Sequence, residues 1–107
     1  MAALITRFRS GTISSTTELA VLDIDAYTNL SYQAKLSGNL AGTLELYVSN
    51  EREGPWVKKE DADLEVVAGQ DYLVEVIGIA TAYCRFVINV DSGSGSVYLV
   101  PCAKGIG

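Results

Sequence analysis

The chain has 107 residues and a formal net charge of −5, with 49% hydrophobic and 20% charged residues. This predicts one domain, residues 1–107, with a hydrophobic core rather than a disordered chain. The acidic balance and dispersed cations argue against nucleic acid as a partner, and no apolar run approaches the roughly 18–20 residues of a membrane helix.

Residues 1–12 combine apolar and basic side chains: Leu4, Ile5 and Phe8 stand beside Arg7 and Arg9. The segment lacks the long apolar middle of a secretion signal, so synthesis in the cytoplasm is expected. Two interpretations stay open. The segment is either an edge strand of the domain or an arm that docks on an acidic neighbouring surface.

The next predicted strands lie at residues 16–24, 29–36 and 43–48. In the latter pair, apolar and polar residues alternate with the period of a strand that has one buried face. A hairpin centred on Leu40 would place Leu36 opposite Leu44 and Lys35 opposite Glu45, so apolar and charged residues match together. We therefore predict this hairpin.

Residues 49–56, SNEREGPW, form a charged turn that ends in the only tryptophan of the sequence. Asn50 and Gly54 suit a sharp reversal, and a proline fixes the approach to Trp56. We expect Trp56 to fold back as a lid over one end of the core. The alternative is a binding platform, with Asn50 and Glu53 beside the ring.

Residues 60–65, EDADLE, place carboxylates at alternate positions, as calcium loops do. Val66 stands where an EF-hand needs glycine, and Tyr72 where it needs a bidentate acid, so an EF-hand is excluded. A solvated acidic loop is the simplest interpretation. A looser calcium site is the alternative for these residues, and a site for a basic partner is the alternative for the whole acidic stretch between Glu51 and Glu65. No metal site is predicted.

Three further strands are predicted at residues 71–79, 82–90 and 96–102. The glycine- and serine-rich stretch between the last two predicts a second hairpin, centred on Gly93. Pro101 cannot donate to a strand ladder, so its strand is expected at a sheet edge or near its own end.

The hairpin centred on Gly93 would set Cys84 directly opposite Cys102. Two buried thiols are expected in a chain without a secretion signal, and a cross-strand disulfide is the alternative. Neither cysteine has a neighbouring base that would make it a nucleophile.

Together these patterns predict an all-β fold, an antiparallel, jelly-roll-like β-sandwich of about six to eight short strands. The chain contains no histidine, which removes the Ser-His-Asp and Cys-His systems and the common zinc sites. No phosphate-binding or dinucleotide motif is present either. We therefore expect no enzyme activity and no cofactor.

The stretches GTLELYVSNEREGPW and YCRFVINVDSGSGSVYLV, followed by AKG, resemble small all-β virion proteins of tailed bacteriophages. The resemblance covers residues 29–105 and departs at residues 51–53, where a compact Asp-Gly turn is more usual. The matching positions are Gly42, Ser49, Asn50, Gly54, Trp56, Arg85, Gly93 and Gly95.

The resemblance implies a capsid decoration or cement protein of the virion head. It would bind the major capsid protein or another virion protein and form a homo-oligomer, with a trimer favoured. A carbohydrate-binding module of a fibre or tail protein is the alternative, and a small enzyme comes third. The candidate interface residues are Leu4, Ile5, Arg7, Phe8, Arg9, Asn50, Glu53 and Trp56.

Overall fold

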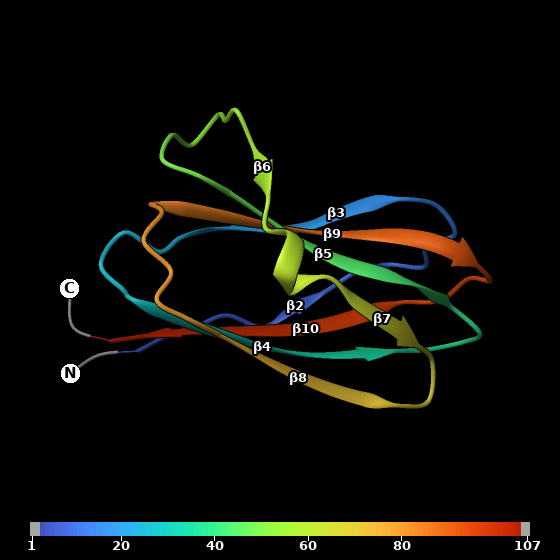
Figure 1. The fold of residues 1–107 in the computed structure, drawn as a ribbon. Helices are drawn as coiled ribbons and strands as arrows, with labels where there is room; N and C mark the ends of the chain where they lie inside the picture. Colours follow the sequence, from blue (N-terminus) through green and yellow to red (C-terminus); the bar gives the residue numbers. More distant parts are fainter. Residues whose placement is uncertain (1–2, 106–107) are drawn as a thin grey trace.

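The computed structural model describes residues 3–105, which form two antiparallel five-stranded sheets packed face to face (Figure 1). Sheet I contains β1 (Leu4–Ile5), β2 (Phe8–Arg9), β4 (Asn29–Leu36), β8 (Asp71–Ile77) and β10 (Val97–Lys104). Sheet II contains β3 (Thr17–Asp23), β5 (Ala41–Ser49), β6 (Val57–Lys58), β7 (Leu64–Val67) and β9 (Tyr83–Ser92). The short 3₁₀ helix η1 (Glu60–Ala62) lies between β6 and β7. The predicted all-β sandwich is confirmed.

The strand order is that of a jelly roll. Sheet I runs β1/β2–β10–β4–β8, and sheet II runs β3–β9–β5, with β7 and β6 both pairing with β5. If β1 and β2 are counted as one interrupted strand and β6 as an addition, eight strands form two four-stranded sheets, as in a jelly roll of two Greek keys. The six long strands, in chain order β3, β4, β5, β8, β9 and β10, lie alternately in sheet II and sheet I. Consecutive long strands therefore belong to opposite sheets.

The core lies between the sheets and is built by the alternation read from the sequence. In β4, Leu30, Tyr32, Ala34 and Leu36 are all buried, whereas the residues between them are more exposed. Tyr32 meets Phe86 of the opposite sheet edge to face, with ring centres 4.9 Å apart. The hydroxyl of Tyr32 donates a hydrogen bond of 2.9 Å to the carbonyl of Ala62, so η1 is attached to the core.

The predicted hairpin of residues 29–48 is wrong, although both of its strands exist. β4 pairs with β10 and β8, while β5 pairs with β9, β7 and β6 in the other sheet. Lys35 lies across from Asp71 rather than Glu45, and Glu45 pairs with Lys58 instead. Leu40, the expected hairpin tip, is fully buried, because the chain turns there from one sheet into the other.

The second predicted hairpin is wrong for the same reason. β9 belongs to sheet II and β10 to sheet I, so Cys84 and Cys102 do not face each other. Both are free cysteines, but the expectation that both are buried holds only for Cys84. Cys84 points into the core and is fully buried, whereas Cys102 is half-buried on the outer face of sheet I.

The two connections that leave these strands pack against each other at one end of the sandwich. The Asn39 side-chain oxygen accepts a 2.9 Å hydrogen bond from the Ser94 backbone, and the Ser37 and Ser96 hydroxyls lie 2.8 Å apart. At Gly95, a Cβ atom would lie 2.0 Å from the Ser37 carbonyl oxygen. The glycines in these segments, interpreted from the sequence as signals of hairpin turns, instead allow the β4–β5 and β9–β10 connections to approach each other closely.

The prediction that Pro101 lies at a sheet edge or strand end is also wrong. β10 lies between β4 and the β1/β2 edge, and it continues to Lys104. The Pro101 carbonyl accepts a 3.1 Å hydrogen bond from Thr6, which lies in the gap between β1 and β2. The missing proline N–H therefore falls where the neighbouring strand is already interrupted.

Candidate functional site

The candidate residues near the N-terminus lie on the interrupted edge of sheet I. β1 and β2 both pair with β10, so Leu4–Arg9 lies along the sheet. Leu4 and Phe8 pack against the core, while Ile5 and Arg9 point to the outer face. The Arg9 guanidinium lies 4.4 Å from the Tyr98 ring centre, and Arg7 is exposed in the gap between β1 and β2.

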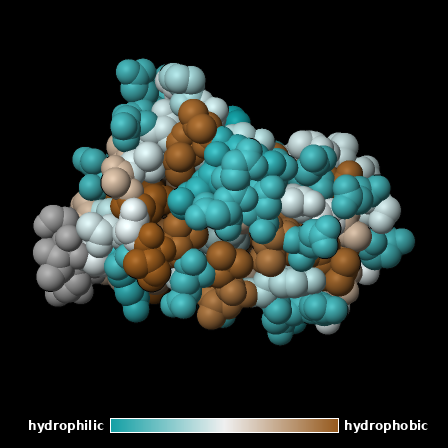
Figure 2. All heavy atoms as spheres, in the orientation of Figure 1, coloured by the Kyte–Doolittle hydropathy of each residue, from teal (hydrophilic) through white to brown (hydrophobic). Residues whose placement is uncertain are grey.

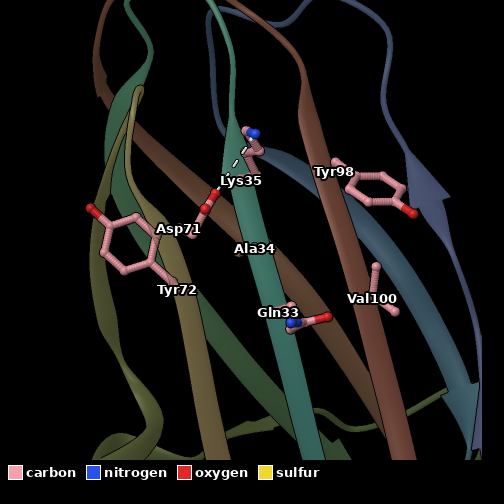
Figure 3. Close-up of a pocket in the computed structure, with 7 residues that line it drawn as sticks. All are labelled: Gln33, Ala34, Lys35, Asp71, Tyr72, Tyr98 and Val100. Atoms are coloured by element: carbon pink, nitrogen blue, oxygen red, sulfur yellow. Dashed lines mark ion pairs between the residues drawn. The ribbon is translucent and has the colours of Figure 1, made fainter.

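The outer face of sheet I is a shallow, mixed surface across β10, β4 and β8. One hollow on it has a volume of about 250 Å³ and is lined by Gln33, Lys35, Asp71, Tyr98 and Val100, among others. Figure 3 shows these side chains, with Lys35 reaching towards Asp71. The Lys35–Asp71 ion pair spans 3.9 Å between two strongly exposed side chains. Because both side chains are strongly exposed, they are accessible to a partner, and their ion pair contributes little to stability.

The second group of candidate residues lies on the other sheet, in the loop between β5 and β6. This loop extends away from the body of the sandwich (Figure 1). Asn50 fixes its base, because its side-chain oxygen accepts a 3.2 Å hydrogen bond from the Ala82 backbone N–H. Glu53 is exposed at its tip. The structure therefore does not bring the two groups of candidate residues together into one site.

Trp56 does not act as a lid over the core. Its side chain is half-buried and is not among the side chains that form the core or pack against it. Its ring lies 5.1 Å from the guanidinium of Arg85, which points outward from β9. The same guanidinium lies 5.1 Å from the Tyr47 ring, so one cation contacts two aromatic rings on the outer face of sheet II.

Sequence reasoning missed this Arg85 cluster, defined here as Tyr47, Trp56 and Arg85. Tyr47 and Arg85 are direct cross-strand neighbours of β5 and β9. Arg85 also forms a 3.4 Å ion pair with Glu18 of β3. The signal was present as outward-facing positions on two strands, but their adjacency depends on a pairing that is not local in sequence.

A charged network continues from the cluster along the same face. Lys58 lies 3.0 Å from Asp63 and 3.3 Å from Glu45, and these carboxylates raise its pKa. Burial, then the hydrogen bond to Glu45, raises the pKa of Tyr47. The acidic stretch of residues 60–65 is thus partly neutralised by lysines.

Within residues 3–105 no group of three acidic, cysteine or histidine side chains is arranged to hold a metal ion.

Cys84 has the surroundings of an inert structural thiol. It is fully buried, and that burial raises its pKa to about 12. The nucleophilic form of cysteine is the thiolate, so a raised pKa disfavours nucleophilic catalysis at this position.

In the described part of the chain, no helix is long and apolar enough to cross a membrane.

The chain matches no protein-family model and no curated protein in sequence. Its fold does match solved structures. The SPBc2 prophage-derived protein YomS is similar with a TM-score of 0.59 at 16% identity, over 96% of this chain and 95% of that one. PirA is similar with a TM-score of 0.58 at 12% identity, over 94% and 92% of the two chains.

A chain of the T13 viral particle of infectious bursal disease virus is also similar. Its TM-score is 0.54 at 16% identity, over 95% of this chain but only 31% of that chain. At these identities the comparisons establish a shared β-sandwich fold. The structural neighbours include a phage-derived protein and a viral particle protein.

Proposed function

We propose that this chain is a non-enzymatic structural component of a bacteriophage virion, a capsid decoration or cement protein that binds and stabilises the head shell. The observation that carries the proposal is the likeness to the prophage protein YomS over nearly the full length of both chains. The likeness to a viral particle chain supports the same class of protein. Jelly rolls are frequent in viral capsids, although the fold alone does not define a function.

The outer face of sheet I has features that suit binding to another protein. Ile5, Leu73 and Ile77 are 51%, 63% and 77% exposed, and all three lie on the outer face of sheet I. Exposed apolar side chains set among charged ones are typical of a protein interface. The proposed partner is the major capsid protein or another virion protein. The protein itself would act as a homo-oligomer, with a trimer favoured.

The test uses the phage that encodes this chain. Mass spectrometry of purified particles should detect the protein, and particles from a deletion strain should lose their contents at a lower temperature. Adding the purified protein back should restore heat stability. If purified wild-type particles lack the protein, the proposed function is wrong.

A carbohydrate-binding module of a fibre or tail protein is the second candidate. The half-buried Trp56 favours it, and the loop that ends at Trp56 borders a hollow of about 360 Å³ lined by Asn50, Pro55 and Thr81, although the Trp56 side chain does not line that hollow. Aromatic rings beside amides and carboxylates recognise sugars. Because the chain has one tryptophan, saccharide titration monitored by its fluorescence tests this directly. Saturable changes would favour this candidate over the structural one.

A further inference from the structure

The four sheet edges differ in how they resist an added strand. β1 and β2 are two residues each, with a gap between them, and β6 and β7 are two and four residues with η1 between them. β3 contains a register shift between Glu18 and Ala20. Short strands and bulges are the devices by which proteins protect sheet edges from further pairing.

β8 has none of these devices. It is seven residues long, pairs with β4 in an unbroken register, and contains no proline and no lysine. Within residues 3–105, no strand pairs with its other side. Among residues 3–105, no backbone hydrogen bond outside the ladders involves residues 71–77. The strand therefore presents a row of backbone groups available for a further ladder.

The outward-facing side chains of β8 alternate between acidic and apolar. Asp71 and Glu75 are four positions apart, and Leu73 and Ile77 between and beyond them are 63% and 77% exposed. Asp71 has only the loose 3.9 Å pair with Lys35, and Glu75 takes part in no ion pair among the described residues. Hydrophobic groups appear along the lower rim in Figure 2, where β8 runs in Figure 1.

A hollow of about 110 Å³ lies beside this strand. Four consecutive residues of β8, Val74–Ile77, line it together with Lys59, Asp61 and Ala62. Consecutive residues of a strand point to opposite faces, so a space lined by four of them follows the strand edge. Lys59 is paired with Asp61 at 3.3 Å. A small space therefore runs along part of the open edge.

We propose that β8 binds an extended segment of a virion partner, which adds to sheet I as an antiparallel strand. The segment carries basic residues four positions apart, opposite Asp71 and Glu75, and apolar residues opposite Leu73 and Ile77. Main-chain hydrogen bonds provide affinity in this mode, and alternate side chains provide specificity. Because the occupant belongs to the virion partner, this inference rests on the proposed function.

Charge decides against a second copy as the occupant. Pairing β8 with itself about Val74 sets Leu73 of each copy opposite Glu75 of the other. Asp71 and Glu75 of both copies then gather on one face with no lysine of β8 among them. Centring on Leu73 or Glu75 instead places carboxylates directly opposite each other. Like charges across a strand pair are destabilising, whereas a basic partner makes favourable pairs at both acids.

The probe is the capped peptide Val-Thr-Arg-Val-Ile-Thr-Arg, with Val-Thr-Glu-Val-Ile-Thr-Glu as its acidic control. Titration into ¹⁵N-labelled protein should shift the backbone amide signals of β8 and of Lys59–Asp61, and leave β3 unchanged. The acidic peptide should produce no such shifts. Absence of binding by the basic peptide, or equal binding by both, overturns the inference.

Two variants with the same change in net charge locate the site. Glu75→Lys should weaken binding of the basic peptide by about fivefold to tenfold, because one favourable cross-strand pair becomes repulsive. Glu65→Lys, an exposed acid on β7 of the other sheet, should bind like the wild type. Equal affinities of the two variants would contradict the assignment to β8.

Particles separate failure of this inference from failure of the proposed function. Glu75→Lys should bind deletion-strain particles more weakly than Glu65→Lys does. If both variants bind particles equally well, the virion role stands and the β8 edge is not the docking site. Sedimentation of the free protein completes the test. A dimer that Glu75→Lys alters would identify a second copy as the occupant and overturn the inference.

Discussion

Arg85 lies between two aromatic rings, with its guanidinium carbon 5.1 Å from the ring centres of both Tyr47 and Trp56. Its ion pair with Glu18 adds a contact to a third strand. The residue therefore connects β3, β5 and β9 to the start of β6 on the outer face of sheet II. This gives Trp56 a structural role: it attaches the end of the exposed loop to the sheet.

Replacing Arg85 with methionine should loosen this loop. Each cation–π contact contributes about 0.5–1 kcal/mol at an exposed site, so Arg85→Met should lower the free energy of unfolding by about 1–2 kcal/mol. Protease cleavage within residues 50–55 should become faster, and Trp56 fluorescence should change. Arg52→Met is the control, since Arg52 is exposed and lies 6.0 Å from the Tyr83 ring. Equal effects of the two variants would contradict this role.

The two cysteines should differ in reactivity. Cys102 lies half-buried on an outer face, whereas Cys84 is fully buried and its pKa is raised to about 12. A thiol reagent at pH 8 should modify one cysteine in the native protein and two in urea, as counted by mass spectrometry. The Cys102→Ser variant should show no native labelling. Rapid labelling of Cys84 in the folded protein would contradict the buried position.

At the scale of elements, the fold depends on long strands that lie alternately in the two sheets. The β4–β5 and β9–β10 connections carry the chain from one layer to the other, and each supports the other through hydrogen bonds. The β4–β5 connection is not a tight hairpin, because Leu40 within it is buried between the layers. The packed pair of connections is therefore part of the core's end rather than a surface loop.

Gly95→Ala tests this packing. The added methyl group would lie 2.0 Å from the Ser37 carbonyl oxygen, so the two connections must separate. We expect a loss of about 1–3 kcal/mol in the free energy of unfolding, as for other overpacked sites. Gly11→Ala is the matched control, because nothing lies within 4 Å of its added Cβ. Urea denaturation of both variants measures the difference, and similar midpoints would refute the close approach.

At the scale of the whole molecule, several buried or paired groups respond to alkaline pH in the same direction. Burial raises the pKa of Cys84 from 9.0 to about 12. The pKa of Tyr32 rises from 10.0 to about 12, mainly because of burial and secondly because of the nearby Asp63 carboxylate. The unfolded chain therefore loses these protons at lower pH than the folded chain does. Their contribution to stability is complete below pH 9 and falls as pH rises towards 12.

The free energy of unfolding should accordingly fall between pH 9 and pH 11. Cys84 alone should account for about 2–3 kcal/mol of this loss, because a tenfold difference in proton affinity between the folded and unfolded chains corresponds to about 1.4 kcal/mol. Cys84→Ala should show a shallower decline over this range, even if it is less stable at pH 7. Cys102→Ala still contains Cys84 and should decline like the wild type. Parallel profiles for Cys84→Ala and the wild type would contradict the cause.

Alternation with a period of two was enough to find the strands and to say which of their faces is buried. Residues 29–36 and 43–48 were placed correctly as strands, and an all-β sandwich followed from the number of such segments. The absence of histidine removed several classes of catalytic site without any structure. These conclusions depend only on local chemistry, because a half-buried strand needs one apolar face whatever its neighbours are.

Only the tertiary structure decided which strands pair, and with them the Arg85 cluster and the open edge of β8. The apolar face of β4 can be buried whether β5 lies beside β4 in one sheet or across the core in the other sheet. The alternation in sequence therefore does not distinguish a Leu44 that pairs with Leu36 within a sheet from a Leu44 in the facing sheet. Pairings such as β3 with β9 and β1 with β10 join segments far apart in sequence. Their choice is made by how the whole set of apolar faces closes around one core, which no single stretch of sequence encodes.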